Sequence, residues 1–225
     1  MPETLASMSY VRAAAFRCGS LSLEEGSLGI VASASLEQGR AFVDVLMGLA
    51  PPDEGEVRLL GQNLHEWPES QRLGLLAEVG HAGSGLVSNL KVWENLSLPA
   101  LFHQRATPDE IEQRLLQALD RLPNKEEWMQ NRLFALPDTL SSYAVRMSSL
   151  IRCAIARPRL LVTEFLLDDL DGEALERLQA MLEWMREQQP KLAVLMVHRG
   201  ATEDGDSPLP RLRPDWMIQL EDPQS

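Results

Sequence analysis

Residues 26–61 read GSLGIVASASLEQGRAFVDVLMGLAPPDEGEVRLLG. The stretch joins a short apolar run, a loop of small residues, an amphipathic segment, a Pro-Gly turn and a second apolar run. Four apolar residues of the middle segment recur at helical spacing: Phe42, Val45, Leu46 and Leu49. Residues 51–55 (PPDEG) end that helix as a turn, and 56–60 form the next strand. The order of strand, small-residue loop and helix is the order in which a phosphate-binding loop is built.

The loop lacks the side chains that phosphate chemistry needs. A working loop uses glycines to bring backbone N–H groups onto the phosphates, a Lys for the outer oxygens and a Ser or Thr hydroxyl for Mg²⁺. Here the first lysine of the chain is Lys91, and Glu37 would repel an anion at the helix N-terminus. The candidate phosphate-binding residues are Ser33, Ser35, Gly39, Arg40 and Ala41.

Composition excludes some classes of partner. The 225 residues fit one domain with a substantial core, and the net charge of −12 opposes binding to the nucleic-acid backbone. Cys18 and Cys153 lie far apart without metal-ligand spacing, so we expect reduced, buried thiols and no metal site. No signal peptide and no apolar run of about 20 residues is found, so any role at a membrane requires docking to a membrane protein.

Further elements follow in an alternating order. Residues 107–119 begin with Thr-Pro-Asp-Glu, a capping box with Pro at the first helical position. Helices are also predicted over 142–156 and 173–188, and strands over 10–31 (with a turn at 23–26), 160–163, 192–197 and about 215–222. Strands that alternate with helices predict a mostly parallel sheet. The helix-only stretch at about 95–155 predicts a helical subdomain.

At this point the chain resembles the nucleotide-binding subunit of an ABC transporter over nearly its whole length. Six segments carry the resemblance in the right order: the strand-turn-strand entry at 21–31, GLAPPDEGEVRLLGQNL, NLKVWENLSLPALFH, LPDTLSSYAVRMSSLIRCAIARPRLLVTEF, LAVLMVHRGATE and PDWMIQLED. The resemblance implies a single domain over 1–225. Its fold class would be α/β, a P-loop NTPase-like mostly parallel sheet with an antiparallel N-terminal β portion and a helical subdomain.

The family's phosphate loop can be aligned in two ways. Without a gap, Gly39 stands at the family's Lys, and Arg40 and Ala41 stand at its Ser/Thr pair. A shift of one residue makes Gly39-Arg40 stand for Gly-Lys and leaves Ala41 and Phe42 at the hydroxyl positions. The Mg²⁺ hydroxyl is absent in both. Arg40 is either a bidentate donor to a phosphate oxygen or a solvated residue of the first helical turn.

The other motifs of the family are also altered. The Q-loop glutamine falls at Ala82, next to His81, and the two signature glycines fall at Ser142 and Tyr143, after Ser141. Thr163 replaces the Mg²⁺-binding Asp. The residues retained at catalytic positions are Glu164, at the general base, and His198, at the switch histidine; Asp168–Asp171 loosely covers the D-loop. Glu164 and His198 are therefore the catalytic candidates, with polar caps on strand ends as the alternative.

The resemblance implies a transporter subunit with impaired chemistry. We expect it to dock to an integral-membrane permease on the cytoplasmic face of the membrane, as a homodimer or a mixed dimer, with weak or absent ATP hydrolysis. Binding of ATP and of Mg²⁺ is in doubt. The alternatives are an active ATPase with an unconventional site and a protein-interaction scaffold without nucleotide. The segment ENLSLPALFH resembles the subgroup that powers lipid transport with MCE-type (Mla) partners. Trp93 and Trp128 are either partner anchors or core residues.

Overall fold

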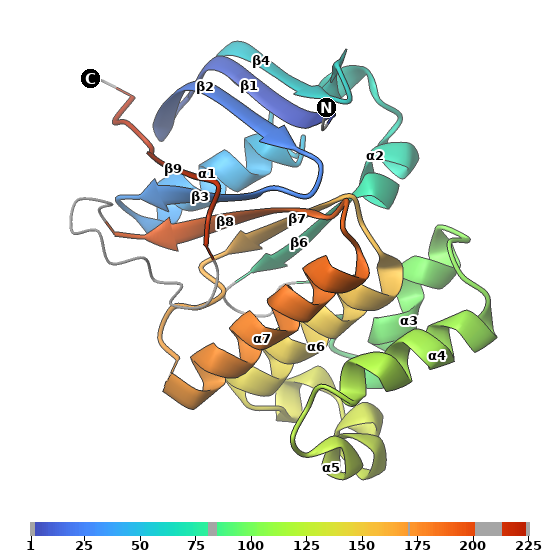
Figure 1. Cartoon of the computed structure of the whole chain (residues 1–225). Coiled ribbons are helices and arrows are strands. Elements are labelled where there is room, and N and C mark those ends of the chain that lie inside the picture. Colours follow the sequence, from blue (N-terminus) through green and yellow to red (C-terminus); the bar gives the residue numbers. More distant parts are fainter. Residues whose placement is uncertain (1–2, 81–84, 171, 201–212, 224–225) are drawn as a thin grey trace.

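Two β-sheets and a group of helices make up the molecule (Figure 1). The computed structural model describes residues 3–80, 85–170, 172–200 and 213–223. The strands are β1 (Thr4–Ala13), β2 (Phe16–Glu24), β3 (Leu28–Ser33), β4 (Glu54–Leu59), β5 (Gln62–Asn63), β6 (Leu76–Gly80), β7 (Leu160–Glu164), β8 (Ala193–Arg199) and β9 (Trp216–Gln219). The α-helices are α1 (Leu36–Leu46), α2 (Glu69–Leu75), α3 (Val92–Phe102), α4 (Pro108–Leu119), α5 (Lys125–Gln130), α6 (Ser142–Ala156) and α7 (Gly172–Gln188). Short 3₁₀ turns are η1 (Leu64–Glu66), η2 (Arg132–Phe134) and η3 (Pro137–Thr139).

The larger sheet is parallel, as the sequence predicts. Its strand order is β6-β7-β8-β3-β9, and each neighbouring pair runs parallel. All residues of β3 and β7 are buried, because the sheet is covered on both faces. Such coverage explains why these strands read as continuous apolar runs instead of alternating ones.

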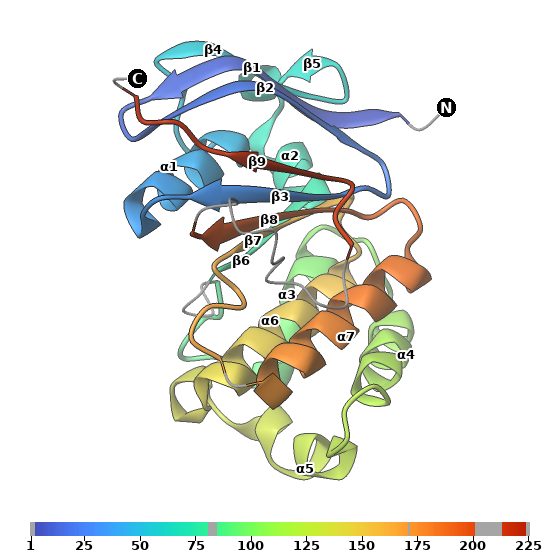
Figure 2. The same ribbon diagram turned by 60° about the vertical axis from the view of Figure 1, so that its left-hand side comes forward.

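The smaller sheet is antiparallel and has the order β2-β1-β4-β5. Buried and exposed residues mostly alternate along β2, as a sheet with one solvated face requires. Helix α1 packs between the two sheets (Figure 2), where the Phe42 ring meets the Phe16 ring edge-on at 5.5 Å between centroids. The predicted α/β class with an antiparallel N-terminal portion is confirmed.

Helices α3 to α7 lie on the other face of the parallel sheet (Figure 2), whereas Leu75 of α2 packs against the core between the sheets. The predicted capping box at α4 is present: the Thr107 hydroxyl accepts from the Glu110 N–H at 3.3 Å, and the Glu110 carboxylate accepts from the Thr107 N–H at 2.8 Å. Trp128 is fully buried in this core, so the core alternative holds for it, whereas Trp93 is exposed. Among the described helices, none combines the length and the apolar character needed to cross a bilayer.

Several elements differ from the sequence expectations. Helix α2 and strand β6 were not predicted, although β6 is an edge strand of the parallel sheet. Strand β1 begins at Thr4, earlier than the predicted strand region. Most of the loop expected after β8 lies outside the described residues. Cys18 and Cys153 are buried free thiols, as expected, and burial raises the pKa of each to about 11.

Gly29 provides a test of how the edge strand β9 is held. A Cβ at Gly29 would lie 2.2 Å from the Trp216 ring, so we expect Gly29→Ala to displace β9 and destabilise the fold by about 1–3 kcal/mol. Gly19→Ala is the matched control, because no atom lies within 4 Å of a Cβ there. Thermal unfolding of both variants decides the matter. An equal stability of the two would show that the Gly29–Trp216 contact does not constrain the sheet.

Candidate functional site

The candidate site lies at one edge of the parallel sheet. In the strand register, Ser33 is level with Arg199, and Glu164 is level with Val197, next to His198. The carboxyl ends of β3, β7 and β8 therefore bring Ser33, Glu164 and His198 to the same edge, where open α/β sheets bind their ligands.

The small-residue loop after β3 is closed by its own side chains. Ser35 is the N-cap of α1, and its hydroxyl accepts from the Gln38 N–H at 3.1 Å. The Gln38 side chain folds back over the loop: its Oε1 accepts from the Ala34 N–H at 2.8 Å, and its Nε2 donates to the Glu221 carbonyl at 3.2 Å. Two of the N–H groups that a phosphate would use are thus bonded internally.

Gly39 is packed from behind by an aromatic ring. A Cβ at this position would lie 2.3 Å from Cζ of Phe165 and 3.0 Å from Oγ of Ser33. Phe165 follows β7 and has a positive φ of 50°. A larger residue at Gly39 therefore requires the ring to move. The neighbouring Ala41 packs against the core between the sheets and offers no hydroxyl.

Arg40 is held by carboxylates from three elements. Its Nη1 lies 2.7 Å from Glu78 Oε1 in β6 and 3.1 Å from Glu164 Oε2 in β7, and its Nη2 lies 2.8 Å from Asp44 Oδ1 in α1. Partial burial lowers the pKa of Arg40, but the three carboxylates together raise it above its usual value. Arg40 is thus partly exposed, as a residue of the first helical turn would be, but an ion-paired network fixes its guanidinium.

Two buried polar residues lie at the end of β7, the ionisable Glu164 and the neutral Thr163. Burial raises the pKa of the Glu164 carboxyl, while the Arg40 charge and hydrogen bond act in the opposite direction. Thr163, directly before it, is fully buried, and its hydroxyl has no hydrogen-bond partner among the described residues. The only ionisable side chain of β7 is thus committed to Arg40.

His198 contacts the segment after β7. Its Nδ1 lies 3.4 Å from Asp168 Oδ1, and the Arg199 Nε lies 3.6 Å from Asp168 Oδ2. The buried Arg146 of α6 donates from Nη1 to the carbonyls of Leu166 at 2.7 Å and Asp168 at 2.6 Å. Arg146 therefore ties α6 to the loop that carries the partner of His198.

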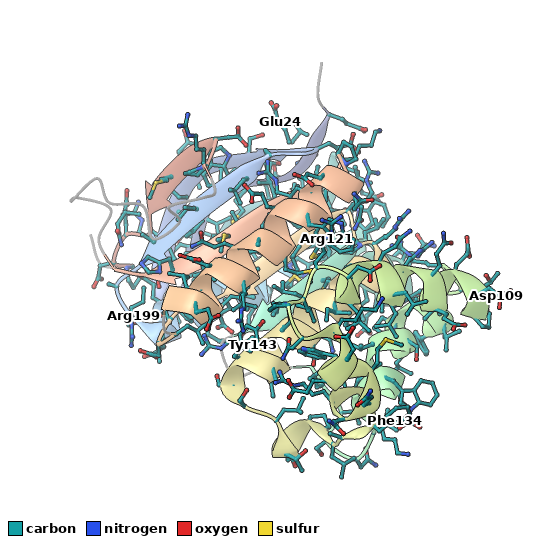
Figure 3. The ribbon with its side chains drawn as sticks, turned by 60° about the horizontal axis from the view of Figure 1, so that its bottom comes forward. Glu24, Asp109, Arg121, Phe134, Tyr143 and Arg199 are labelled. Carbon is teal, nitrogen blue, oxygen red and sulfur yellow. The ribbon has the colours of Figure 1, made fainter. Side chains whose placement is uncertain are left out.

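The signature residues lie at the start of α6. Ser141 caps the helix by accepting from the Ala144 N–H at 3.3 Å, and Ser142 is exposed. The Tyr143 ring is half-buried against the helical core, with the Arg177 guanidinium of α7 6.0 Å from its centroid (Figure 3). Tyr143 thus joins α6 to α7. The Q-loop positions His81 and Ala82 lie outside the described residues.

Three residues of the site were missed in the sequence: Gln38, Asp44 and Glu78. The spacing of Arg40 and Asp44 on one helix was a usable signal for an ion pair. Glu78 could have been found only by recognising β6, since its carboxylate meets Arg40 across 38 residues of sequence.

A separate hollow lies beside the helices. A cavity of about 180 Å³ lies between α2, β6, α3 and α6, lined by Leu73, Ala77, Pro99, His103, Arg105 and Cys153 among others. On α3 next to it, four large apolar side chains are exposed: Trp93, Leu98, Leu101 and Phe102. Phe134, after α5 (Figure 3), and Leu136 are exposed as well. The Val92 N–H donates to the Ala135 carbonyl at 2.9 Å. We call these six exposed residues the α3 patch.

Comparison with known proteins finds relatives that are ATP-binding proteins of export or release systems. No family model matches the sequence. The chain is 33% identical over 165 residues to the cytochrome c biogenesis ATP-binding export protein CcmA of Cupriavidus necator, covering 72% of this chain and 67% of that protein. It is 25% identical over 173 residues to the lipoprotein-releasing system ATP-binding protein LolD of Idiomarina loihiensis, covering 73% and 72%. The dimeric ATP-binding cassette MJ0796, bound to ADP and Pi, is 18% identical with a TM-score of 0.76, covering 97% and 95%; this likeness concerns the fold.

Arg146→Met tests the tie between α6 and the loop after β7. The substitution leaves two buried carbonyls without their donor, so we expect a loss of about 2–4 kcal/mol in the free energy of unfolding. Arg152→Met is the control on the same helix, because Arg152 is not buried and donates to the Gly85 carbonyl at the surface. We expect about 0.5 kcal/mol or less there. Equal losses in denaturant unfolding would contradict a special role for Arg146.

Proposed function

Because the chain belongs to the family of ATP-binding subunits of ABC transporters, we propose that it is a transporter subunit with little or no ATP hydrolysis of its own. The observation that carries the proposal is the state of Arg40, whose guanidinium is bound to Asp44, Glu78 and Glu164 beside the phosphate loop. Phosphates would have to compete with three carboxylates for this cation. The acidic side chains around it would in turn repel them.

With Arg40 in place among the carboxylates, the residues present do not fit a magnesium ion. Thr163 is neutral and buried at the end of β7, and Ala41 supplies no hydroxyl. Among the described residues, no group of three or more His, Cys, Asp or Glu side chains is arranged to hold a metal. A hard cation such as Mg²⁺ takes oxygen ligands in near-octahedral geometry. We therefore propose that Mg²⁺ is not a cofactor of this site.

The loop is equally unsuited to the phosphates of ATP. Gln38 occupies the Ala34 N–H, and Glu37 places a negative charge in the first turn of α1. Phosphoryl transfer depends on positioning and charge stabilisation, and one lost group of this kind costs about 10²–10³ in rate. Glu164 and His198 keep their places, but the closed loop beside them offers few groups that could hold a phosphate. Their proposed role is structural, through Arg40 and Asp168.

We propose that the α3 patch receives the membrane permease. Six large apolar side chains exposed over one helix and the turn beside it are more than scattered surface residues, and such patches mark protein contacts. Docking there would place the chain on the cytoplasmic face of the membrane. The dimer formed by MJ0796 supports pairing with a second cassette, either a copy of this chain or an intact one.

The transported substrate stays open. The relatives' names refer to cytochrome c biogenesis and to lipoprotein release. The lipid-transport subgroup with MCE-type partners is kept as a proposal that rests on the segment from Glu94 to His103. The alternative of an active ATPase would require the ion pairs of Arg40 with Asp44, Glu78 and Glu164 to break when nucleotide binds.

Calorimetric titration with ATP, with and without Mg²⁺, tests the loss of nucleotide chemistry. We expect no binding up to millimolar ATP, because the loop is closed by Gln38 and Arg40 is paired. An intact ABC cassette titrated under the same conditions is the positive control. Micromolar, Mg²⁺-dependent binding that tightens in Glu164→Gln would overturn the proposal in favour of the active alternative.

Charge placed on the α3 patch tests the docking surface. Phe102 is 73% exposed, so Phe102→Asp should leave folding intact and reduce recovery of the permease with the tagged chain at least about 10-fold. The control is Tyr10→Asp, at an aromatic residue that is 79% exposed on the antiparallel sheet. The membrane protein recovered with the unmodified chain is identified by mass spectrometry. Recovery of no integral-membrane protein would favour the scaffold alternative.

A further inference from the structure

Arg40, Asp44, Glu78 and Glu164 form what we call the Arg40 network. Its carboxylates surround one positive charge, as they would surround a bound cation, but here the cation is a side chain of the protein. Three carboxylates from α1, β6 and β7 converge on a single guanidinium. Two of them, Glu78 and Glu164, share the same nitrogen, Nη1, at 2.7 and 3.1 Å. Their oxygens are therefore close enough to repel each other strongly if no positive charge lies between them.

The position of this network coincides with the edge at which the family binds nucleotide. Arg40 follows the phosphate loop in α1, and Glu164 ends the strand that carries the family's metal-binding residue. A group that binds there must satisfy carboxylates of β6 and β7 and, at the same time, contact the start of α1. The guanidinium of Arg40 does both from within the chain.

We propose that Arg40 is a built-in replacement for the magnesium–phosphate group, and that it holds α1 against the carboxyl ends of β6 and β7 without any ligand. The inference rests on the proposed function, in which this site takes no MgATP. It assigns to Arg40 a positioning role that the sequence alternatives did not include. It also assigns a role to Glu78 and Asp44, whose carboxylates pair with the Arg40 guanidinium.

The consequence is a site whose clustered carboxylates always have a cation between them. Removal of ordinary ligands from a nucleotide site leaves its carboxylates unpaired, which is costly when they are largely buried, as Glu78 and Glu164 are. With Arg40 in place, the site edge keeps one arrangement whether or not Mg²⁺ or nucleotide is present. The chain would thus present a fixed surface to a partner cassette.

Removal of the internal cation and its replacement by a metal ion test the proposal. We expect Arg40→Ala to lower the Tm by at least about 4 °C, because buried carboxylates lose their counter-ion. We expect about 10 mM MgCl₂, measured against EDTA, to restore about half of that loss or more. The unmodified chain should show no response to MgCl₂ alone, because Arg40 already occupies the position between the carboxylates.

The matched control is Arg58→Ala. Arg58 has nearly the same side-chain exposure as Arg40, 45% against 42%, and it pairs with the exposed Glu56. We expect only a small change in Tm there and no response to MgCl₂. A magnesium response in this control equal to that of Arg40→Ala would overturn the proposal, since the effect would then be non-specific.

A second variant keeps the test decisive if Arg40→Ala does not fold. Arg40→Ala combined with Glu164→Gln removes one opposing charge, so it should fold and be more stable than the single variant. No gain in stability from Glu164→Gln, or no effect of magnesium on a folded Arg40→Ala, would overturn the role of Arg40. If the unmodified chain instead binds MgATP in calorimetry, it is the proposed function that fails.

Discussion

The register of the parallel sheet is the constraint on which the rest of the structure depends. Ser33, Glu164 and His198 come to one edge because β3, β7 and β8 are paired in parallel and end together. Parallel pairing requires crossovers and coverage of both faces, which α1 and the antiparallel sheet provide on one side and α6 and α7 on the other. The fold therefore assembles the site edge whether or not the residues there retain their chemistry.

Charge balance at that edge follows from its burial. A carboxylate at the end of a buried strand must be paired or take up a proton, and burial does raise the pKa of Glu164. In this chain the cation beside Glu164 is Arg40, and the neutral Thr163 adds no further negative charge at the end of β7. The substitutions at these positions are thus mutually consistent. The Lys of the family's phosphate loop and its Mg²⁺-binding Asp are both absent here, and an ion pair between Arg40 and Glu164 is present instead.

The elements with strong local signals could be predicted from the sequence, but the network could not. The capping box at Thr107 and the helix over 142–156 match the structure, because caps and apolar spacing act within a few residues. The short edge strand β6 carries a charged Glu78 and was overlooked. Its meeting with Arg40 depends on pairing between β6 and β7, which are far apart in sequence. Side-chain pairs of this kind are set by topology and cannot be read from local pattern.

Loss of nucleotide chemistry is compatible with retention of the fold, since little of the core involves the site. Phe42, Val45 and Leu46 bury one face of α1 between the sheets, while Arg40 lies on its opposite, partly exposed side. The same helix therefore serves the core independently of what its first turns bind. Substitutions in the phosphate loop can accumulate as long as α1 stays docked. An internal ion pair that secures α1 to β6 and β7 removes the need for a ligand to do so.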